Sequence, residues 1–254
     1  MLLAVDVGNS NIVVGLYDGE NLKENWRIST IKDRTADEYG VILKNLFKYS
    51  EVDIKVSGII ISSVVPPVMP ALREMSKKYF DIEPVVIGPG IKTKMPIKYE
   101  NPREVGADRI VNAVAAYDKY GGPVIVVDYG TATTFCAVSE QGEYLGGCIA
   151  PGVGISTEAL FNKAAKLPRI QIEKPPNVIG RNTVQSMQSG IYYGFIGQLD
   201  GMVLQIKKEL GHSTKVVATG GIASLIAPDS REVDIVDPLL TLEGLRIIFK
   251  ANRG

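Results

Sequence analysis

Two short segments of the sequence each place an aspartate, a glycine and a short polar residue directly after an apolar stretch. The first is Leu2–Ser10, which reads LLAVDVGNS, and the second is Val124–Thr131, which reads VIVVDYGT. Glycine lets the backbone approach a ligand, amide and hydroxyl groups donate hydrogen bonds to phosphate oxygens, and a carboxylate holds a cation beside them. Each segment therefore predicts a loop that binds the phosphates of a nucleotide. The alternative is that each aspartate merely starts a turn.

The second segment repeats the first at an offset of 122 residues, about half of the 254-residue chain. In both copies two further strand patterns follow, joined by a turn that contains Gly19 in the first copy and Gly142 in the second. A motif repeated with the same downstream hairpins indicates a duplicated domain, with a cleft between two facing phosphate loops. We place the halves at 1–120 and 121–254, with the C-terminal helix able to pack back on the first half.

The other patterns describe strands that alternate with helices, which is typical of a mixed sheet in an α/β domain. A capping box from Thr35 to Glu38 predicts the start of the first helix. Strands are predicted at 2–7, 11–17, 21–30, 58–62, 85–87, 124–128, 133–139, 144–150 and 215–218, and further helices from Pro66, Pro102, Thr183 and about Pro238.

The sequence Gly106-Ala-Asp-Arg109 lies at or near the start of the helix that follows Pro102. A helix N-terminus binds anions, and together with Arg109 it is expected to keep Asp108 ionised. In phosphoryl transfer an aspartate accepts the proton of the substrate hydroxyl, while cations and amides neutralise the moving charge. Asp108 is therefore a candidate general base. The alternative is an ordinary N-cap beside a solvated Arg109.

Glycine is over-represented, with 26 residues, or about 10% of the chain against an average near 7%. Gly220 and Gly221 follow an apolar strand and suit either a backbone surface against a nucleoside or a tight strand-to-helix turn. Four others lie inside the predicted helix from Thr183 to about Leu210, where each glycine costs about 1 kcal/mol. They predict close packing, within the chain or at a subunit interface: Gly190, Gly194, Gly197 and Gly201.

Composition excludes several classes of protein. Lys plus Arg equals Asp plus Glu, 28 each, so the composition shows no basic footprint for nucleic acid, and only a local basic patch stays open. The one histidine, His212, excludes HExxH and multi-histidine metal sites, and the sequence has no P-loop motif. Cys136 and Cys148 lie in apolar stretches and are predicted to be buried thiols of a reducing compartment. Without a signal-peptide pattern or an apolar run of about 18 residues, we expect a cytoplasmic protein that does not enter the membrane.

Taken together, these motifs resemble those of the type III pantothenate kinases, a family of the acetate kinase, sugar kinase, Hsp70 and actin superfamily. The resemblance covers nearly the whole chain, and it implies an α/β fold of duplicated ribonuclease H-like (actin-like ATPase) domains. Each domain would be a mixed five-stranded sheet with flanking helices, with a cleft between the two. Seven motifs in order carry it: DVGNSN at 6–11, NPREVGADR at 101–109, DYGTATT at 128–134, GGCIAPG at 146–152, GRNT at 180–183, TGG at 219–221 and DPLLTLEGL at 237–245.

The resemblance implies a homodimer that phosphorylates the 4′-hydroxyl of pantothenate with ATP, the first step of coenzyme A biosynthesis. Asp108 would be the general base, Asp128 would bind a monovalent cation (K⁺ or NH₄⁺), and Asp6 would lie near Mg²⁺, through water. Arg109 suits the substrate carboxylate. ATP would contact Asp6, Val7, Gly8, Asn9, Ser10, Asn11, Ile12, Val13, Gly130, Thr131, Gly220 and Gly221, and pantothenate would contact Tyr99, Gly106, Ala107, Asp108, Arg109 and Thr183.

Two other functions stay open from the sequence. One is another small-molecule kinase of the same superfamily, such as a sugar kinase, although the Cys/His zinc cluster of some sugar kinases cannot be built with one histidine and two cysteines. The other is non-enzymatic, because relatives of the family have been named Bvg accessory factor, a transcription-linked role. Release of ADP in the presence of pantothenate or of sugars, with and without K⁺, separates the three functions.

Overall fold

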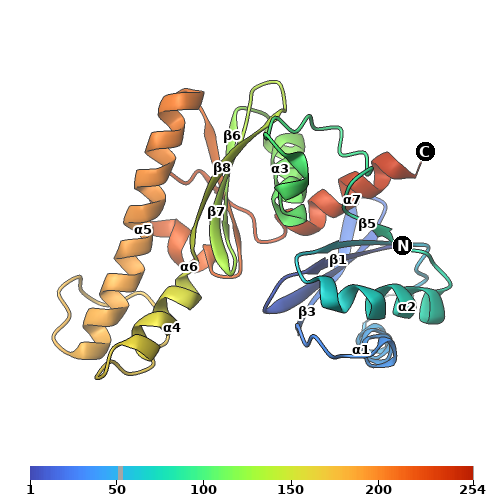
Figure 1. The fold of residues 1–254 in the computed structure, drawn as a ribbon, viewed down its shortest axis with the longest axis horizontal. Coiled ribbons are helices and arrows are strands. Elements are labelled where there is room, and N and C mark those ends of the chain that lie inside the picture. The colour runs from blue at the N-terminus through green and yellow to red at the C-terminus, as the bar shows by residue number, and fades with distance from the viewer. Residues whose placement is uncertain (51–53, 254) are drawn as a thin grey trace. The chain divides into compact units, whose positions relative to one another are not determined.

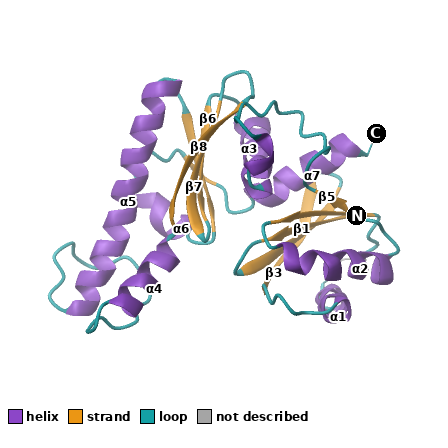
Figure 2. Ribbon diagram, viewed as in Figure 1, coloured by secondary structure: helices purple, strands orange, loops and turns teal. Residues whose placement is uncertain are grey.

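The structure is a computed structural model, and it describes residues 1–50 and 54–253. Two five-stranded sheets, each flanked by helices, make up the fold (Figures 1 and 2). Both sheets contain parallel and antiparallel neighbours, so the predicted class of two mixed five-stranded sheets is confirmed. By internal packing the chain forms two compact units. The first comprises Met1–Lys94, Asn101–Ala115 and Thr241–Gly254, and the second comprises Met95–Glu100 and Ala116–Leu240.

The sheet of the first unit has the strand order β3-β2-β1-β4-β5. β1 (Leu2–Val7), β2 (Asn11–Asp18) and β3 (Asn21–Ser29) form the antiparallel meander that the sequence predicted. β4 (Gly58–Ser63) and β5 (Val85–Val86) then add in parallel to β1. The turn between β1 and β2 therefore leaves the sheet at the carboxyl end of its central strand.

Helices cover both faces of this first sheet. α1 (Ala36–Lys48) and α2 (Met69–Phe80) bury their apolar sides against one face in a cluster that includes Leu3, Val5, Tyr39, Leu43 and Leu72. The predicted capping box is present, because Thr35 Oγ1 accepts a hydrogen bond from the Glu38 amide and Glu38 accepts one from the Thr35 amide. α7 (Leu240–Asn252) packs on the other face, where a Cβ on Gly15 or Gly58 would overlap Leu242 or Phe249.

The second unit repeats this plan with the strand order β10-β9-β6-β7-β8. β6 (Val124–Tyr129), β7 (Ala132–Val138) and β8 (Tyr144–Pro151) are antiparallel, and β9 (Lys215–Gly220) and β10 (Ile235–Val236) add in parallel. The matching order is the physical counterpart of the repeated sequence motif. A separate apolar core lies between this sheet and α5 (Thr183–Leu210), as Phe135, Ile191, Tyr192 and Leu199 show.

Several short elements were not predicted individually: α4 (Val153–Lys163), α6 (Ala223–Ile226) and the two-residue strand β10. Such elements are short enough that tertiary packing, and not a repeating apolar pattern, decides them. The helix expected after Pro102 and up to about Tyr120 is α3 (Ala107–Tyr120), and a separate 3₁₀ turn at Pro102–Glu104 precedes it. The boundary between the two units falls inside α3, because Ala115 belongs to the first unit and Ala116 to the second.

Neither Cys136 nor Cys148 is part of a disulfide. Cys136 on β7 is buried and Cys148 on β8 is half-buried. In the register of the two strands Cys148 pairs with Phe135 and Cys136 pairs with Gly147, so the cysteine side chains point to opposite faces of the sheet. Their predicted thiol state is therefore confirmed, while full burial holds for Cys136 alone.

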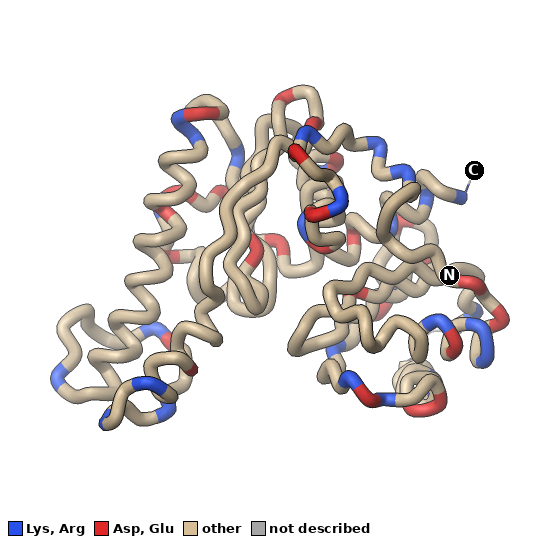
Figure 3. The backbone as a smooth tube through the Cα atoms, in the orientation of Figure 1, with Lys and Arg blue, Asp and Glu red and all other residues tan. Residues whose placement is uncertain are grey.

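Charged residues of both signs are interspersed along both units (Figure 3). His212 lies in an exposed turn after α5, as predicted. Among the helices formed by the described residues, none has both the length and the apolar character that crossing a bilayer requires.

Candidate functional site

The turn between β1 and β2 is the first of the two predicted phosphate loops. Gly8, Asn9 and Ser10 connect the strands, and Asn9 and Ser10 are exposed. The amide of Gly8 donates a 3.0 Å hydrogen bond to the carbonyl oxygen of Asn11, which closes the turn. A Cβ on Gly8 would lie 3.2 Å from the same oxygen, so glycine gives the turn its tightness. The arrangement presents exposed backbone beside a carboxylate.

That carboxylate is Asp6, which is half-buried and lies two residues before Gly8. Its neighbours across the sheet are Val13 on β2 and Ser62 on β4. Ser62 is 0% exposed, and its Oγ has no hydrogen-bond partner within the described part of the chain. Ser62 was not predicted as a site residue, because the position of a serine in an apolar strand is known only once the strands are paired.

The turn between β6 and β7 is the second predicted phosphate loop. Gly130 and Thr131 are exposed, and the Gly130 amide donates a 3.1 Å hydrogen bond to the carbonyl oxygen of Ala132. Asp128 stands two residues earlier and is paired in register with Thr219 of β9. The two turns therefore repeat the same relation between an aspartate, a glycine and an exposed polar residue.

The predicted nucleoside turn lies directly beside Asp128. Gly220 ends β9 with φ +98, and a Cβ there would lie 2.5 Å from Asp128 Oδ1 and 2.6 Å from the Tyr129 amide nitrogen. The amide of the exposed Gly221 donates a 3.1 Å hydrogen bond to the Tyr129 carbonyl. The structure thus brings together Asp128, Gly130 and the Gly220-Gly221 turn, which lie 90 residues apart in the sequence.

Gly152 is a further part of this second loop that was not predicted as a site residue. It is buried, and a Cβ on it would lie 2.2 Å from the carbonyl oxygen of Thr131 and 2.7 Å from that of Gly130. The loop is therefore backed by the backbone at the end of β8. The signal in the sequence was the glycine-rich stretch at 146–152, whose close approach to Gly130 is a tertiary contact.

Asp108 lies in the first turn of α3, as the sequence predicted. Its Oδ1 accepts a 2.8 Å hydrogen bond from the Arg109 amide. Burial raises the pKa of the Asp108 carboxyl above its ordinary value, and the backbone amide and the charge of Arg109 offset this only in part. The Arg109 amide and charge do favour the ionised form of Asp108, as expected, but desolvation is the larger effect on its pKa. A raised pKa makes Asp108 a better proton acceptor.

Arg109 is 6% exposed, so the alternative of a solvated arginine beside an N-cap was wrong. A guanidinium stays charged when it is buried, and it presents a planar set of donors that matches a carboxylate. Gly106 precedes it and accepts hydrogen bonds from the amides of Arg109 and Ile110 through its carbonyl, at 3.1 and 3.3 Å. Gly106–Arg109 therefore form a compact helix start that carries one acidic and one basic group.

Tyr99 and Thr183 belong to the second unit, whereas Asp6 and Gly106–Arg109 belong to the first. Tyr99 is half-buried and packs against Tyr144 of β8, with the ring centroids 6.5 Å apart. Thr183 is the exposed first residue of α5. It follows the N-cap Asn182, whose Oδ1 accepts a 2.9 Å hydrogen bond from the Gln185 amide.

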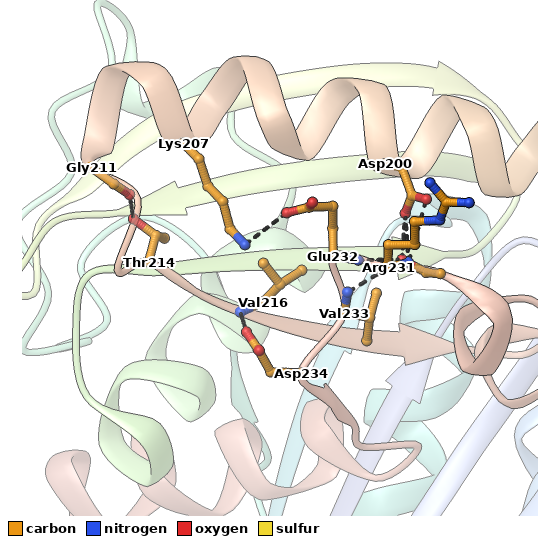
Figure 4. A network of polar contacts seen from close by, with 10 residues as sticks. Asp200, Lys207, Gly211, Thr214, Val216, Arg231, Glu232, Val233 and Asp234 are labelled. Atoms are coloured by element: carbon orange, nitrogen blue, oxygen red, sulfur yellow. Dashed lines mark hydrogen bonds and ion pairs between the residues drawn. The ribbon is translucent and has the colours of Figure 1, made fainter.

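A polar network ties the second half of α5 to the strand that carries Gly220 (Figure 4). Lys207 forms a 2.9 Å ion pair with Glu232, and Asp200 Oδ1 accepts a 2.5 Å hydrogen bond from Ser230 Oγ. Asp234 Oδ2 accepts a 2.8 Å hydrogen bond from the Val216 amide of β9. The segment 230–234 therefore links the start of β9 to α5.

The four glycines of α5 lie on one exposed face. Positions 190, 194, 197 and 201 recur at helical spacing, and a Cβ on any of them would meet no atom of this chain within 4 Å. Of the two alternatives for these glycines, close packing within the chain is therefore wrong for the described residues.

The two mixed five-stranded sheets with their flanking helices have the fold of the actin-like ATPases. A glucokinase of the ROK family from Streptomyces griseus, solved with glucose and AMPPNP, matches with a TM-score of 0.55 and 12% identity over 100% of this chain and 99% of its own. The activator of 2-hydroxyisocaproyl-CoA dehydratase from Clostridium difficile, solved with ADPNP, matches with a TM-score of 0.54 and 13% identity over 99% and 95%. At these identities the likeness concerns the fold alone.

Within this class, the chain belongs to the type III pantothenate kinase family. The family model matches residues 2–205. A type III pantothenate kinase of Moorella thermoacetica is 58% identical over 253 residues, which are 99% of this chain and 100% of that protein. The resemblance inferred from the seven motifs is confirmed.

Proposed function

We propose that this protein is a pantothenate kinase, which transfers the γ-phosphoryl group of ATP to the 4′-hydroxyl of pantothenate and so begins coenzyme A biosynthesis. The observation that carries the proposal is membership of the type III pantothenate kinase family over the full length of the chain. The structure supports it with two exposed aspartate-glycine turns and a partly desolvated aspartate at the start of α3.

We assign the ATP phosphates to the two turns and the nucleoside to the glycine pair after β9. In the first unit the phosphate-binding segment is Asp6–Val13, and in the second it is Gly130 and Thr131. The exposed backbone of these turns supports the assignment, because amide groups and short side chains donate to phosphate oxygens. Gly220 and Gly221 would take the nucleoside, since a flat backbone surface without Cβ atoms lets a ligand approach.

The oxygen donors beside these turns fit two cations. Asp6 would bind Mg²⁺ through water and Asp128 would bind a monovalent cation, K⁺ or NH₄⁺. The described residues hold no group of three or more His, Cys, Asp or Glu side chains that could ligate a metal. One carboxylate with phosphate and water ligands is the usual way in which proteins hold Mg²⁺ at a nucleotide. When bound, the cations neutralise charge on the phosphates.

Asp108 would act as the general base. Its carboxylate accepts the proton of the pantothenate hydroxyl as that oxygen forms a bond to the γ-phosphorus, and the bond between this phosphorus and the bridging oxygen of ADP breaks. The pKa that burial raises supports this role, because a base works best when its pKa approaches the pH of the reaction. Tyr99, Gly106, Ala107, Arg109 and Thr183 would hold pantothenate, with the Arg109 guanidinium on its carboxylate.

We further propose that the enzyme is a homodimer in the cytoplasm. The exposed glycine face of α5 supports the dimer, because small residues let a second helix backbone approach closely and the described residues outside this stretch of helix leave that space open. The free thiols and the use of ATP support the cytoplasm, where thiols stay reduced.

The test is ADP release by the purified protein with Mg²⁺, ATP and K⁺. We expect release that depends on pantothenate and not on glucose or other sugars, and a product that carries one phosphate on pantothenate by mass spectrometry. Replacing K⁺ with Na⁺ should lower the rate. Release that depends on a sugar would support a different kinase, and the absence of any acceptor-dependent release would support a non-enzymatic role.

A further inference from the structure

The turn between β1 and β2 needs a fixed conformation if it is to bind phosphate. Preorganised N–H groups stabilise a charge without rearranging when it arrives, so their direction has to be set beforehand. Asn9 and Ser10 are exposed and have little packing of their own. The bond from the Gly8 amide to the Asn11 carbonyl closes the turn but does not orient it against the rest of the sheet.

Thr30 supplies that orientation. It directly follows β3, the edge strand beside β2, and it is half-buried. Its Oγ1 donates a 2.7 Å hydrogen bond to the carbonyl oxygen of Gly8, and its amide donates a 3.0 Å hydrogen bond to the carbonyl oxygen of Ser10. One residue outside the turn therefore binds both of its ends.

These two bonds also decide where the amides of the turn point. In a planar trans peptide the N–H lies on the opposite side from the C=O of the preceding residue. The Gly8 carbonyl points to Thr30, so the N–H of Asn9 points away from Thr30. The same holds for the Ser10 carbonyl and the N–H of Asn11. Thr30 therefore directs two donors of the proposed phosphate-binding segment.

We propose that Thr30 is a positioning residue for the ATP phosphates. The proposal rests on the proposed function, since it takes the Gly8–Ser10 turn to be a phosphate loop. The hydroxyl acts through the Gly8 carbonyl, and its effect should therefore appear in the use of ATP and not in the use of pantothenate. Asp6, Gly8 and Asn9 carry the contacts to the ligand, and Thr30 keeps them in register.

Thr30→Val tests this role because valine keeps the branched shape and the backbone N–H but removes the hydroxyl donor. We expect the KM for ATP to rise about fivefold to tenfold, which corresponds to about one hydrogen bond. The affinity for mant-ATP with Mg²⁺, measured by fluorescence, should fall by a similar factor, while the KM for pantothenate stays unchanged. Thr30→Ser keeps the hydroxyl and should restore both ATP values.

Ser29→Ala is the matched control, because Ser29 is the exposed neighbour at the end of the same strand. It should leave ATP and pantothenate kinetics unchanged. If Thr30→Val folds poorly, Thr30→Ala is compared with Thr30→Ser in the same assays. A Thr30→Val protein that binds mant-ATP like the wild type overturns the proposal. Equal rises in the KM values for ATP and pantothenate, together with a lower Tm, also overturn it.

Failure of the proposed function gives a different result. If the wild-type protein phosphorylates no pantothenate, the kinase assignment is refuted. If its binding of mant-ATP still depends on the Thr30 hydroxyl, the positioning role is nevertheless supported. If the wild type is active and the Thr30→Val variant has the wild-type KM for ATP and affinity for mant-ATP, the positioning role alone is refuted.

Discussion

The carboxylate of Asp128 lies directly against the backbone of Gly220. A Cβ at position 220 would stand 2.5 Å from Asp128 Oδ1, and the Gly220 φ of +98 lies where residues with side chains are strained. Gly220 therefore has two reasons to be glycine, namely its own backbone conformation and the space that the carboxylate occupies. The second reason links the nucleoside turn to the proposed cation site.

Gly220→Ala should therefore disturb both the fold and the site. The left-handed conformation and the overlap with Asp128 and the Tyr129 amide together are expected to cost about 2 kcal/mol or more. Thermal unfolding should show a lower Tm. Because the Asp128 carboxylate has to move, activation by K⁺, measured as the rate in K⁺ relative to Na⁺, should shrink as well.

Gly154→Ala in α4 is the control for this variant. Nothing lies within 4 Å of a Cβ on Gly154, so alanine is expected to be neutral or to stabilise the helix by up to about 1 kcal/mol. A Gly220→Ala protein with wild-type Tm and wild-type K⁺ activation would contradict the link between Gly220 and Asp128.

Asp108→Asn should separate catalysis from binding and from stability. The change removes the proton acceptor but leaves a carbonyl oxygen for the Arg109 amide, so turnover should fall by about 10²-fold or more while mant-ATP still binds. The Tm at neutral pH should not fall, because burial disfavours the charged carboxylate that the substitution removes. Initial rates, fluorescence titration and thermal unfolding measure the three quantities.

The pH dependence follows from the raised pKa of Asp108. The folded state binds the proton more tightly than the unfolded state, so the ionised group destabilises the fold above its folded pKa. As the pH falls through that pKa toward the ordinary value near 3.9, this penalty disappears. The stability advantage of Asp108→Asn should therefore be present at neutral pH and vanish in acid. An advantage that grows as the pH falls would contradict a raised pKa.

Much of this site could be predicted from the sequence, because its parts are local. The turns after Asp6 and Asp128 are each a few residues long, and the motif around Asp108 marks the start of a helix by itself. The contacts of Gly220 with Asp128, and of Gly152 with Thr131, join segments far apart in the chain, so no local pattern shows them. The raised pKa of Asp108 could not be predicted from the sequence, because burial is a property of the packed fold.

The local elements of the fold could likewise be predicted from the sequence, and the contacts between distant segments could not. The repeated strand patterns showed two mixed sheets, since alternation and apolar runs are local signals. The hydrogen bond between Thr30 and Gly8 could not be predicted from the sequence, because the distance between the two residues depends on the pairing of β2 with β3. The glycines of α5 were ambiguous, and the empty space around their Cβ positions removed one alternative.

Tyr129→Phe should leave stability unchanged or raise it by up to about 1 kcal/mol. Tyr129 is 3% exposed, and its Oη has no hydrogen-bond partner within the described residues. Burial, with a smaller contribution from the Asp200 charge, raises the pKa of this phenol, so it stays neutral. Removing an unsatisfied hydroxyl removes a desolvation cost. Chemical denaturation measures the change.

Tyr192→Phe is the matched comparison in the same core. Tyr192 is 2% exposed, but its hydroxyl has two acceptors for its one proton, the Leu225 carbonyl at 3.2 Å and Asp229 Oδ2 at 3.0 Å. Loss of the Tyr192 hydroxyl should lower the free energy of unfolding by about 1–3 kcal/mol, because one of its two acceptors is charged. Equal destabilisation by the two substitutions would mean that the Tyr129 hydroxyl has a partner.

Gly194→Trp should convert the proposed dimer into a monomer. Gly194 is exposed in the middle of the glycine face of α5, and no described residue outside its own stretch of helix lies within 4 Å of a Cβ placed on it. A second helix packed closely against that face could not accommodate an indole ring, whereas the isolated subunit could. Sedimentation velocity should therefore show a dimer for the wild type and a monomer for the variant, with the far-UV circular dichroism unchanged.

Val41→Trp provides the control for a bulky residue on an exposed helix. Val41 is 52% exposed on α1 in the first unit, whereas the glycine face of α5 belongs to the second unit. This variant should sediment as a dimer. Gly194→Ala should give an intermediate result, because one methyl group adds about 1 kcal/mol of helix propensity to the subunit but crowds a close helix contact. A Gly194→Trp protein that remains dimeric at micromolar concentration would place the interface elsewhere.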